Sequence, residues 1–124
     1  DAGGIIDDLM VTRSVTHDDD GMLLIVVNAA CKQTDYRHIA ERLPQGVTIA
    51  PSLDRALIAL QGPLAGEVMS RHCGEAADLD FMTATSASFD EIDCHVSRTG
   101  YSGEDGFEIS VDASAAETVA RTLL

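Results

Sequence analysis

The sequence predicts an α+β fold in which the sheets are mainly antiparallel. Short segments of strand-forming residues recur along the chain, and turns rich in Gly, Pro and Asp separate them. Helical patterns, with apolar residues three and four positions apart, are interleaved with these strands. Strands joined by tight turns, with helices between some of them, are typical of α+β domains.

Residues 1–53 are expected to contribute the order β-β-α-β. Three strands are predicted, at 5–15, 22–27 and 47–50, and the second is a continuous apolar run suited to a buried strand. The polar segment 17–21 predicts a hairpin loop, and its aspartates lack the ligand spacing of an EF-hand calcium loop. Residues 32–43 show the apolar spacing of an amphipathic helix, which Pro44 ends.

Residues 54–124 are expected to contribute the order β-α-β-β-β-α, with a boundary between the two parts near residues 51–54. The predicted strands lie at 56–60, 81–89, 93–98 and 107–111. A helix is expected to open at residues 61–63, with Pro63 in its first turn. Its inner face is predicted to carry Leu64, Val68 and Met69. A last helix is predicted over 114–124, capped by Ser114.

The chain is strongly acidic, with a formal net charge of −13 from 21 acidic and 8 basic residues. A surface of this sign repels phosphate backbones, so no nucleic acid partner is expected. No run of about 18 apolar residues is present, so no membrane partner is expected either. The sequence starts without Met or a secretory signal and stops inside a helical pattern, so we interpret the chain as a fragment.

The three cysteines, Cys31, Cys73 and Cys94, form no Cys-x-x-Cys pair. Their odd number argues against a disulfide framework and favours a reducing compartment. Two of them have a histidine neighbour. Adjacent residues on a strand point to opposite faces, however, so Cys94 and His95 would not converge on one ion. We therefore expect buried thiols and no metal site.

Two segments have an unusual density of polar groups. The adjacent carboxylates Asp7 and Asp8 fall within a predicted strand, where one would face the interior unless both lie at an exposed strand start. Residues 98–108 contain three glycines at spacings of three, with an Arg, a Tyr and three carboxylates. A loop of this composition is either a ligand site or a wide hairpin with a solvated tip. Its glycine spacing differs from both nucleotide-binding motifs.

Four motifs occur in the order seen in the T-protein of the glycine cleavage system, a folate-dependent aminomethyltransferase. They are GGIIDDL at 3–9, VVNA at 26–29, ALQGP at 59–63 and RTGYSGEDGFE at 98–108. The last motif is highly specific, and the resemblance extends along essentially the whole chain. It implies that the chain is a central part of the T-protein folate-binding domain, without the N-terminal start and the C-terminal barrel of the family.

The resemblance implies which residues contact tetrahydrofolate, the co-substrate. Asp8 would lie beside the reactive nitrogens and is the candidate catalytic residue. Glu108 would bind the pterin edge, where the 2-amino group and N3–H form a pair of donors that a carboxylate accepts in a bidentate arrangement.

The remaining residues that the resemblance implies would complete the folate cavity. Asn28 would help to hold the pterin, and Tyr101 would lie along the folate. Backbone groups near Met10 and Val26 would line the same cavity. Phe81 would lie near the aminobenzoyl ring, although the strand around it matches the family less closely.

The resemblance also implies the reaction and the partners. Folate N5 would attack the methylene carbon of an aminomethyl group on the lipoyl arm of the H-protein. Ammonia would leave, and closure with N10 would give 5,10-methylene-tetrahydrofolate. The Asp8 carboxylate would stabilise the positive charge that develops, without a metal. The parent enzyme would work in a bacterial cytoplasm or the mitochondrial matrix, and the isolated fragment is expected to have weak or no activity.

Two other classes of protein contain a related folate-binding domain. One is the folate-binding half of a sarcosine or dimethylglycine dehydrogenase, but the run of residues 103–108 favours a T-protein. The other is a non-catalytic folate-binding scaffold that assists iron–sulfur assembly. Its hallmark is a short Cys-containing motif with Lys, Gly and Tyr nearby, and none of the three cysteines has all three of these residues as neighbours.

Overall fold

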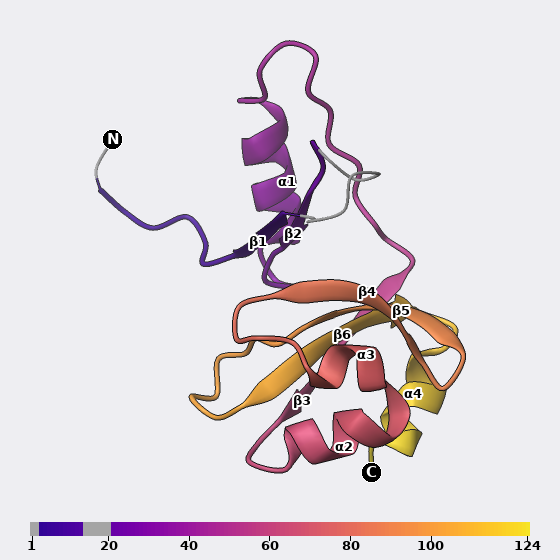
Figure 1. Cartoon of the computed structure of the whole chain (residues 1–124). Coiled ribbons are helices and arrows are strands. Elements are labelled where there is room, and N and C mark those ends of the chain that lie inside the picture. The colour runs from indigo at the N-terminus through magenta and orange to yellow at the C-terminus, as the bar shows by residue number, and fades with distance from the viewer. Residues whose placement is uncertain (1–2, 14–20) are drawn as a thin grey trace. The chain divides into compact units, whose positions relative to one another are not determined.

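The structure is a computed structural model that describes residues 3–13 and 21–124. The chain divides into two compact units, Asp1–Ser52 (unit 1) and Leu53–Leu124 (unit 2), as Figure 1 shows. Most of the hairpin loop predicted at 17–21 lies outside the described residues, as does the end of the first predicted strand. In the part of the chain that the structure describes, no helix has the length and apolar character needed to cross a membrane.

Unit 1 contains a two-stranded antiparallel ribbon and one helix. Strand β1 (Met10–Arg13) pairs with β2 (Leu23–Val26), and the register places Met10 opposite Val26. A turn closed by the Cys31 N–H, which donates to the Asn28 carbonyl at 3.0 Å, leads into helix α1 (Lys32–Ala40). The ribbon and the helix give the order β-β-α.

The first strand is shorter than the sequence predicts. It begins at Met10 and not at Ile5, because Asp7 and Asp8 are poor strand formers and Asp7 binds Asn28 instead. Both carboxylates therefore precede the strand, so of the two alternatives left open by the sequence, the one that places them inside the strand is wrong.

The other predicted elements of unit 1 also differ from the structure. The strand predicted at 47–50 does not form, because the Val47 N–H donates to the Pro44 carbonyl in a turn. Helix α1 ends at Ala40, three residues before the predicted end. The prediction that β2 is buried is wrong as well, since Leu23 is 59% exposed. An apolar run favours burial but does not supply the layer that would cover it.

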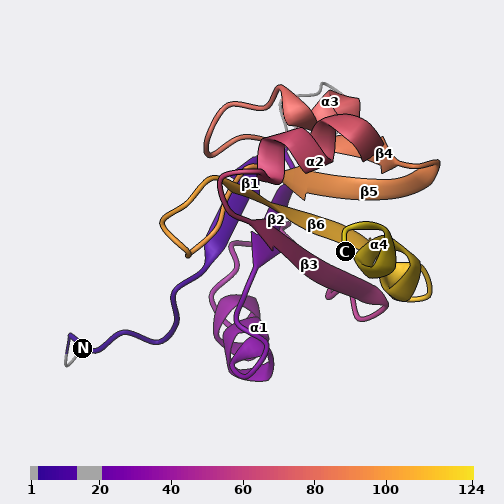
Figure 2. The ribbon, with the colours of Figure 1, turned by 90° about the horizontal axis from the view of Figure 1, so that it is seen from below.

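Unit 2 is a four-stranded antiparallel sheet with three helices. Its elements are β3 (Arg55–Gln61), α2 (Ala65–His72), α3 (Gly74–Ala77), β4 (Ala84–Phe89), β5 (Ile92–Ser97), β6 (Gly106–Asp112) and α4 (Ala116–Thr122). The strand order is β3-β6-β5-β4, so the last strand in sequence lies inside the sheet (Figure 2). The predicted α+β class with antiparallel sheets is confirmed.

The core of unit 2 lies between one face of the sheet and its helices. Along β6, Phe107, Ile109 and Val111 are fully buried, which matches the alternation of a strand with one covered face. Met69 of α2 and Val119 of α4 pack into the same cluster. Since alternate residues point to opposite faces, Glu108 and Ser110 of β6 lie on the other face of the sheet, away from this core.

The helices of unit 2 differ from the predictions in three details. Helix α2 begins at Ala65, and Leu64 is 64% exposed. Of the three residues predicted for the inner face, Met69 is buried and Val68 is half-buried. Helix α3 was not predicted from the sequence. Ser114 does not cap α4, because its hydroxyl and N–H donate to Asp112 and the N-cap position is Ala115.

Candidate functional site

The candidate site residues of unit 1 gather at one end of the β1–β2 ribbon. The register brings Met10 and Val26 directly opposite each other. Asn28 follows β2 and reaches back across the ribbon: its Nδ2 donates to Asp7 Oδ1 at 2.8 Å and to the Asp8 carbonyl at 3.0 Å. Four of the seven residues proposed from the sequence are thus neighbours here.

The two adjacent carboxylates have different environments. Asp7 is half-buried and also accepts the Asn28 backbone N–H at 3.2 Å. The hydrogen bond from the Asn28 side chain lowers the pKa of Asp7, so this carboxylate is ionised. The Asp8 side chain is exposed, and its backbone is held by Asn28. Asp7 is therefore a structural acceptor, and Asp8 presents a carboxylate to solvent.

In unit 2, a chain of hydroxyl groups ends on the Glu108 carboxylate. Glu108 lies on β6, opposite Ser97 of β5. The buried Thr99 hydroxyl lies 2.6 Å from the Ser97 hydroxyl and donates to Glu108 Oε2 at 2.5 Å. A donor to one oxygen fixes the rotamer of a carboxylate while leaving lone pairs on both oxygens for a ligand.

Gln61, the last residue of β3, fills the base of the loop between β5 and β6. Its Nε2 donates to the carbonyl oxygens of Thr99 at 3.0 Å and Phe107 at 3.3 Å. Its Oε1 accepts the Ser102 hydroxyl at 2.9 Å. One amide thus joins both ends of the loop and its tip, and it holds the residue that donates to Glu108.

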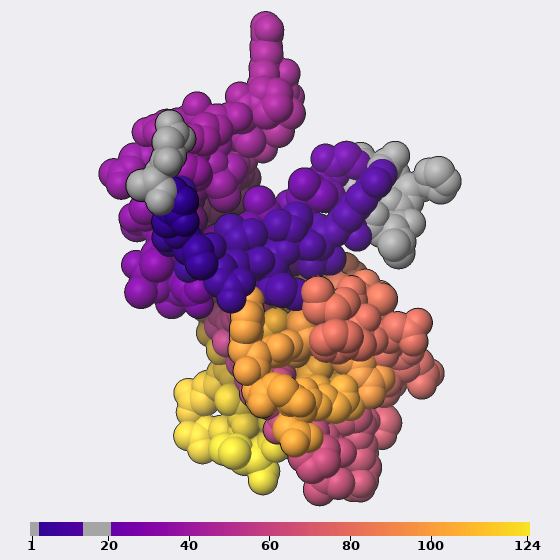
Figure 3. Space-filling view, turned by 90° about the vertical axis from the view of Figure 1, so that its left-hand side faces the viewer, coloured from indigo at the N-terminus to yellow at the C-terminus, as the bar shows by residue number. Residues whose placement is uncertain are grey.

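Two of the three loop glycines are needed because Gln61 lies against them. A Cβ at Gly100 or at Gly106 would overlap the Gln61 side chain. Neither of the two has a positive φ, whereas Gly103 has a φ of 80° and provides the reversal. Loop residues 100–105 are all exposed, and they form part of the surface in Figure 3 (orange).

Arg98 fixes the other side of this loop. Its Nε and Nη2 donate to the two oxygens of Asp105 at 2.8 and 2.7 Å. Its Nη1 donates to the carbonyls of Ala77 at 3.2 Å and Leu79 at 2.8 Å, and its guanidinium carbon lies 5.2 Å from the Phe107 ring centroid. The ion pair raises the pKa of Arg98 and lowers the pKa of Asp105. This is a structural role that the sequence did not assign to either residue.

The two aromatic candidates lie at the surface of unit 2. Tyr101 lies in the exposed loop and is 67% exposed. Phe81 precedes β4 in a turn and is 73% exposed. The strand predicted to begin at residue 81 therefore begins at Ala84. The neighbouring Met82 N–H donates to the Arg98 carbonyl at 3.0 Å, which ties this turn to the start of the same loop.

Sequence reasoning missed the residues that hold the candidate site in place. Asp7, Gln61 and Thr99 all belong to motifs that were recognised, but only their neighbours were given roles. A glutamine next to a β-strand end gives no signal of its own. The signal available in the sequence was Gln61 together with Gly100 and Gly106, which lie 39 and 45 residues later and leave room for its side chain.

The antiparallel α+β fold carries a buttressed carboxylate on the sheet of unit 2, and unit 1 separately carries a polar ribbon end. The chain belongs to the GCVT N-terminal domain family, which matches residues 1–124. It is 41% identical to the mitochondrial aminomethyltransferase of Homo sapiens over 133 residues, covering 100% of this chain and 32% of that protein. It is 39% identical to the aminomethyltransferase of Prochlorococcus marinus (strain MIT 9303), covering 93% of this chain and 33% of that protein.

A solved structure shows the same fold. The glycine cleavage system aminomethyltransferase T from Bartonella henselae superposes with a TM-score of 0.78 at 35% identity, covering 98% of this chain and 32% of that chain. The resemblance inferred from the four motifs is therefore confirmed. The chain spans about a third of the length of these relatives and corresponds to a part of a transferase.

Proposed function

We propose that this chain forms part of the folate-binding domain of an aminomethyltransferase. The reaction is transfer of an aminomethyl group from the lipoyl arm of the H-protein to tetrahydrofolate, with release of ammonia and formation of 5,10-methylene-tetrahydrofolate. Family membership and the names of the relatives support this reading. The partners are then the lipoylated H-protein and folate, and no metal takes part.

The observation that carries the proposal is the buttressed carboxylate of Glu108. Thr99 donates to one of its oxygens, and the side chain lies on the face of the sheet opposite the core. A pterin presents two adjacent donors, its 2-amino group and N3–H, which a fixed carboxylate accepts side by side. Because the carboxylate is held before binding, little side-chain entropy is lost when the pterin arrives.

The ribbon end of unit 1 supplies the second half of the proposal. Both amide hydrogens of Asn28 are used by Asp7 and the Asp8 carbonyl, so its side-chain carbonyl oxygen is the group left to contact a ligand, as an acceptor. Asp8 presents an exposed carboxylate from the same end. A fixed negative charge stabilises the cationic one-carbon unit as ammonia departs, and this is an electrostatic role. Met10, Val26, Tyr101 and Phe81 are proposed to line the folate.

The relatives suggest two cellular compartments for the parent enzyme. The similar proteins include mitochondrial enzymes and bacterial ones. We propose the mitochondrial matrix or a bacterial cytoplasm as the site of action.

Calorimetric titration with 5-formyl-tetrahydrofolate tests the proposal in a full-length protein that contains this chain. Glu108→Ala should weaken binding by roughly 10- to 100-fold, since hydrogen bonds to a charged group contribute about 1.5–3 kcal/mol. The matched control is Glu91→Gln, which removes a carboxylate from the exposed turn between β4 and β5 and should bind as the wild type does.

Three other results would contradict the proposal. Wild-type affinity in Glu108→Ala would rule out the pterin role of this carboxylate. Folate binding without aminomethyl transfer from H-protein would favour a folate-binding scaffold, and oxidation of sarcosine or dimethylglycine with a flavin would favour the dehydrogenase class.

A further inference from the structure

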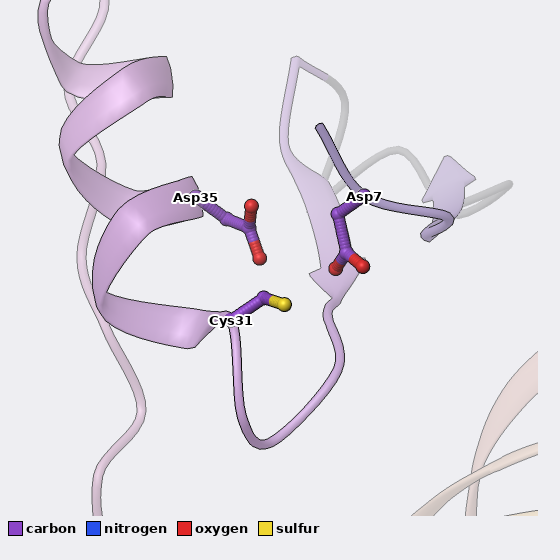
Figure 4. A group of neighbouring side chains, drawn as sticks. All are labelled: Asp7, Cys31 and Asp35. Carbon is purple, nitrogen blue, oxygen red and sulfur yellow. The ribbon is translucent and has the colours of Figure 1, made fainter. Parts of the chain in front are cut away.

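Three potential metal ligands converge in unit 1, apart from the residues proposed to contact folate. They are Asp7, Cys31 and Asp35, and one ligand atom from each lies within 4.8 Å of the other two. Figure 4 shows the two carboxylates and the thiol pointing towards a common point between the start of α1 and the segment before β1. No metal was expected at the cysteines, because Cys94 and its neighbour His95 would point to opposite faces of a strand.

The local structure brings these side chains together without any ligand. Cys31 is the N-cap residue of α1 and Asp35 lies four residues later, so both side chains emerge on the same side of the helix. Asp7 is placed by the two hydrogen bonds from Asn28, at 2.8 and 3.2 Å. The cluster therefore joins α1 to the segment that carries Asp8.

Asp35 provides an independent observation, because its buried carboxylate has an oxygen without a donor. It is only 3% exposed, and its Oδ2 is buried without a hydrogen-bond partner. Among the described residues no Lys or Arg forms an ion pair with Asp7 or Asp35. A buried carboxylate without a donor is costly, and a second carboxylate nearby adds to the cost. A cation at the common point would remove both penalties.

We propose that Asp7, Cys31 and Asp35 bind one divalent zinc-class ion, with water as the fourth ligand. Thiolate and carboxylate are ligands that Zn²⁺ accepts in tetrahedral sites, whereas Ca²⁺ and Mg²⁺ take six or more oxygen ligands. Zinc–ligand bonds of about 2.0–2.3 Å require the three atoms to approach one another by small side-chain rotations. On binding, Cys31 releases its thiol proton to the buffer. If Asp35 is protonated, it releases its carboxyl proton in the same way.

The thiol is what distinguishes this proposal from a simpler arrangement. A proton shared between Asp7 and Asp35 would also relieve their repulsion, and it would leave Cys31 without a role. Zn²⁺ binds the thiolate form of Cys31, so protons compete with the ion and the apparent affinity should increase with pH. The ion would lock the segment before β1 onto helix α1, independently of the proposed folate chemistry.

Spectroscopy of the Co²⁺-loaded protein tests the site in the wild type, without relying on a variant. After metal removal, one equivalent of Co²⁺ per chain should produce the near-ultraviolet thiolate-to-cobalt charge-transfer band, and Zn²⁺ should displace it. Competition with a chromophoric chelator then gives the Zn²⁺ affinity. Zinc should also raise the thermal unfolding midpoint, because it binds only the folded chain.

Variants assign the ligands. Cys31→Ser and Asp35→Asn should each weaken Zn²⁺ binding by at least about tenfold, the smallest effect typical of a disturbed metal environment. The control Cys73→Ala removes a buried thiol of unit 2 and should retain the cobalt band. Absence of the band in the wild type, or its persistence in a folded Cys31→Ser variant, would overturn the proposal.

Discussion

The Thr99 hydroxyl donates to Glu108 Oε2 at 2.5 Å, and the Thr99 carbonyl accepts from Gln61 Nε2 at 3.0 Å. One residue thus connects the end of strand β3 with the carboxylate proposed to bind the pterin. Because Thr99 is 95% buried, with 5% of its surface exposed, water does not replace these contacts when one is removed. The position of Glu108 therefore depends on two residues that are not themselves expected to contact the ligand.

Replacing Thr99 by Val tests this dependence. The change keeps the shape of the side chain and removes the hydroxyl that donates to Glu108. Affinity for 5-formyl-tetrahydrofolate in the full-length protein should fall by roughly tenfold, the equivalent of about 1.4 kcal/mol, because the carboxylate loses its fixed rotamer. Thr99→Ser, which keeps a hydroxyl, should recover most of the affinity. Equal affinities for Val and Ser would show that the hydrogen bond has no role in binding.

The contact between Gln61 and Gly100 predicts a specific non-additivity. Gly100→Ala places a methyl group where the Gln61 side chain lies and should destabilise the protein by about 1–3 kcal/mol. Gln61→Ala removes the side-chain donor to the carbonyls of Thr99 and Phe107 and should cost a similar amount. The double variant should be less destabilised than the sum, since removing Gln61 makes room for the methyl group. Urea unfolding of the four proteins measures the coupling, and additive effects would contradict the close approach.

The Arg98–Asp105 pair predicts a pH dependence of stability. Two hydrogen bonds from Arg98 lower the pKa of Asp105 in the folded state. At acidic pH the unfolded chain then binds more protons at this residue. Its contribution is complete above the ordinary Asp pKa of about 3.9 and is lost as the pH falls through the lower folded-state value.

Asp105→Asn should therefore cost stability at pH 7 and less at pH 2–3. The loss at pH 7 should be about 0.5–1 kcal/mol, because the Asp105 side chain is 38% exposed and solvent screens the pair. Urea unfolding at several pH values measures the difference between variant and wild type. A difference that stays constant from neutral to acidic pH would show that the ion pair is not its source.

The sequence predicted the parts of the fold that depend on local pattern. Short runs of apolar, strand-forming residues located β3 and β6, and Phe107 and Ile109 of β6 are buried in the structure. The predicted start of α2 was too early, because Pro63 permits a first helical turn but does not require one. The strand expected at 47–50 had suitable residues but gained no partner, and a strand forms only where a neighbouring strand accepts its hydrogen bonds.

The candidate site was predicted residue by residue through resemblance, but its supports were not. Asn28 was expected to hold the pterin, and in the structure its amide hydrogens hold Asp7 and the Asp8 carbonyl. These contacts join Asn28 to residues 20 and 21 positions earlier in the chain. The periodicity of a sequence does not predict pairings at such separations. The convergence of Cys31 and Asp35 with Asp7 is of the same kind, since only the path of the chain brings a helix start next to an irregular segment.

Asp8 and Asp7 provide the sharpest separation of a catalytic role from a structural one. Asp8→Asn removes an exposed charge without removing a hydrogen bond in the described structure, since only its backbone carbonyl is used by Asn28. The full-length enzyme should keep its unfolding midpoint and lose turnover on the order of 10²-fold, comparable with the loss of one preorganised electrostatic group.

Asp7→Asn is the matched control. It weakens the acceptor of two Asn28 donors, so it should lower the unfolding midpoint, and its turnover per folded molecule should fall far less. Steady-state assays of ammonia release, with thermal unfolding of both variants, measure the split. Wild-type turnover in Asp8→Asn would remove Asp8 from the mechanism, whatever the effect of Asp7→Asn on stability.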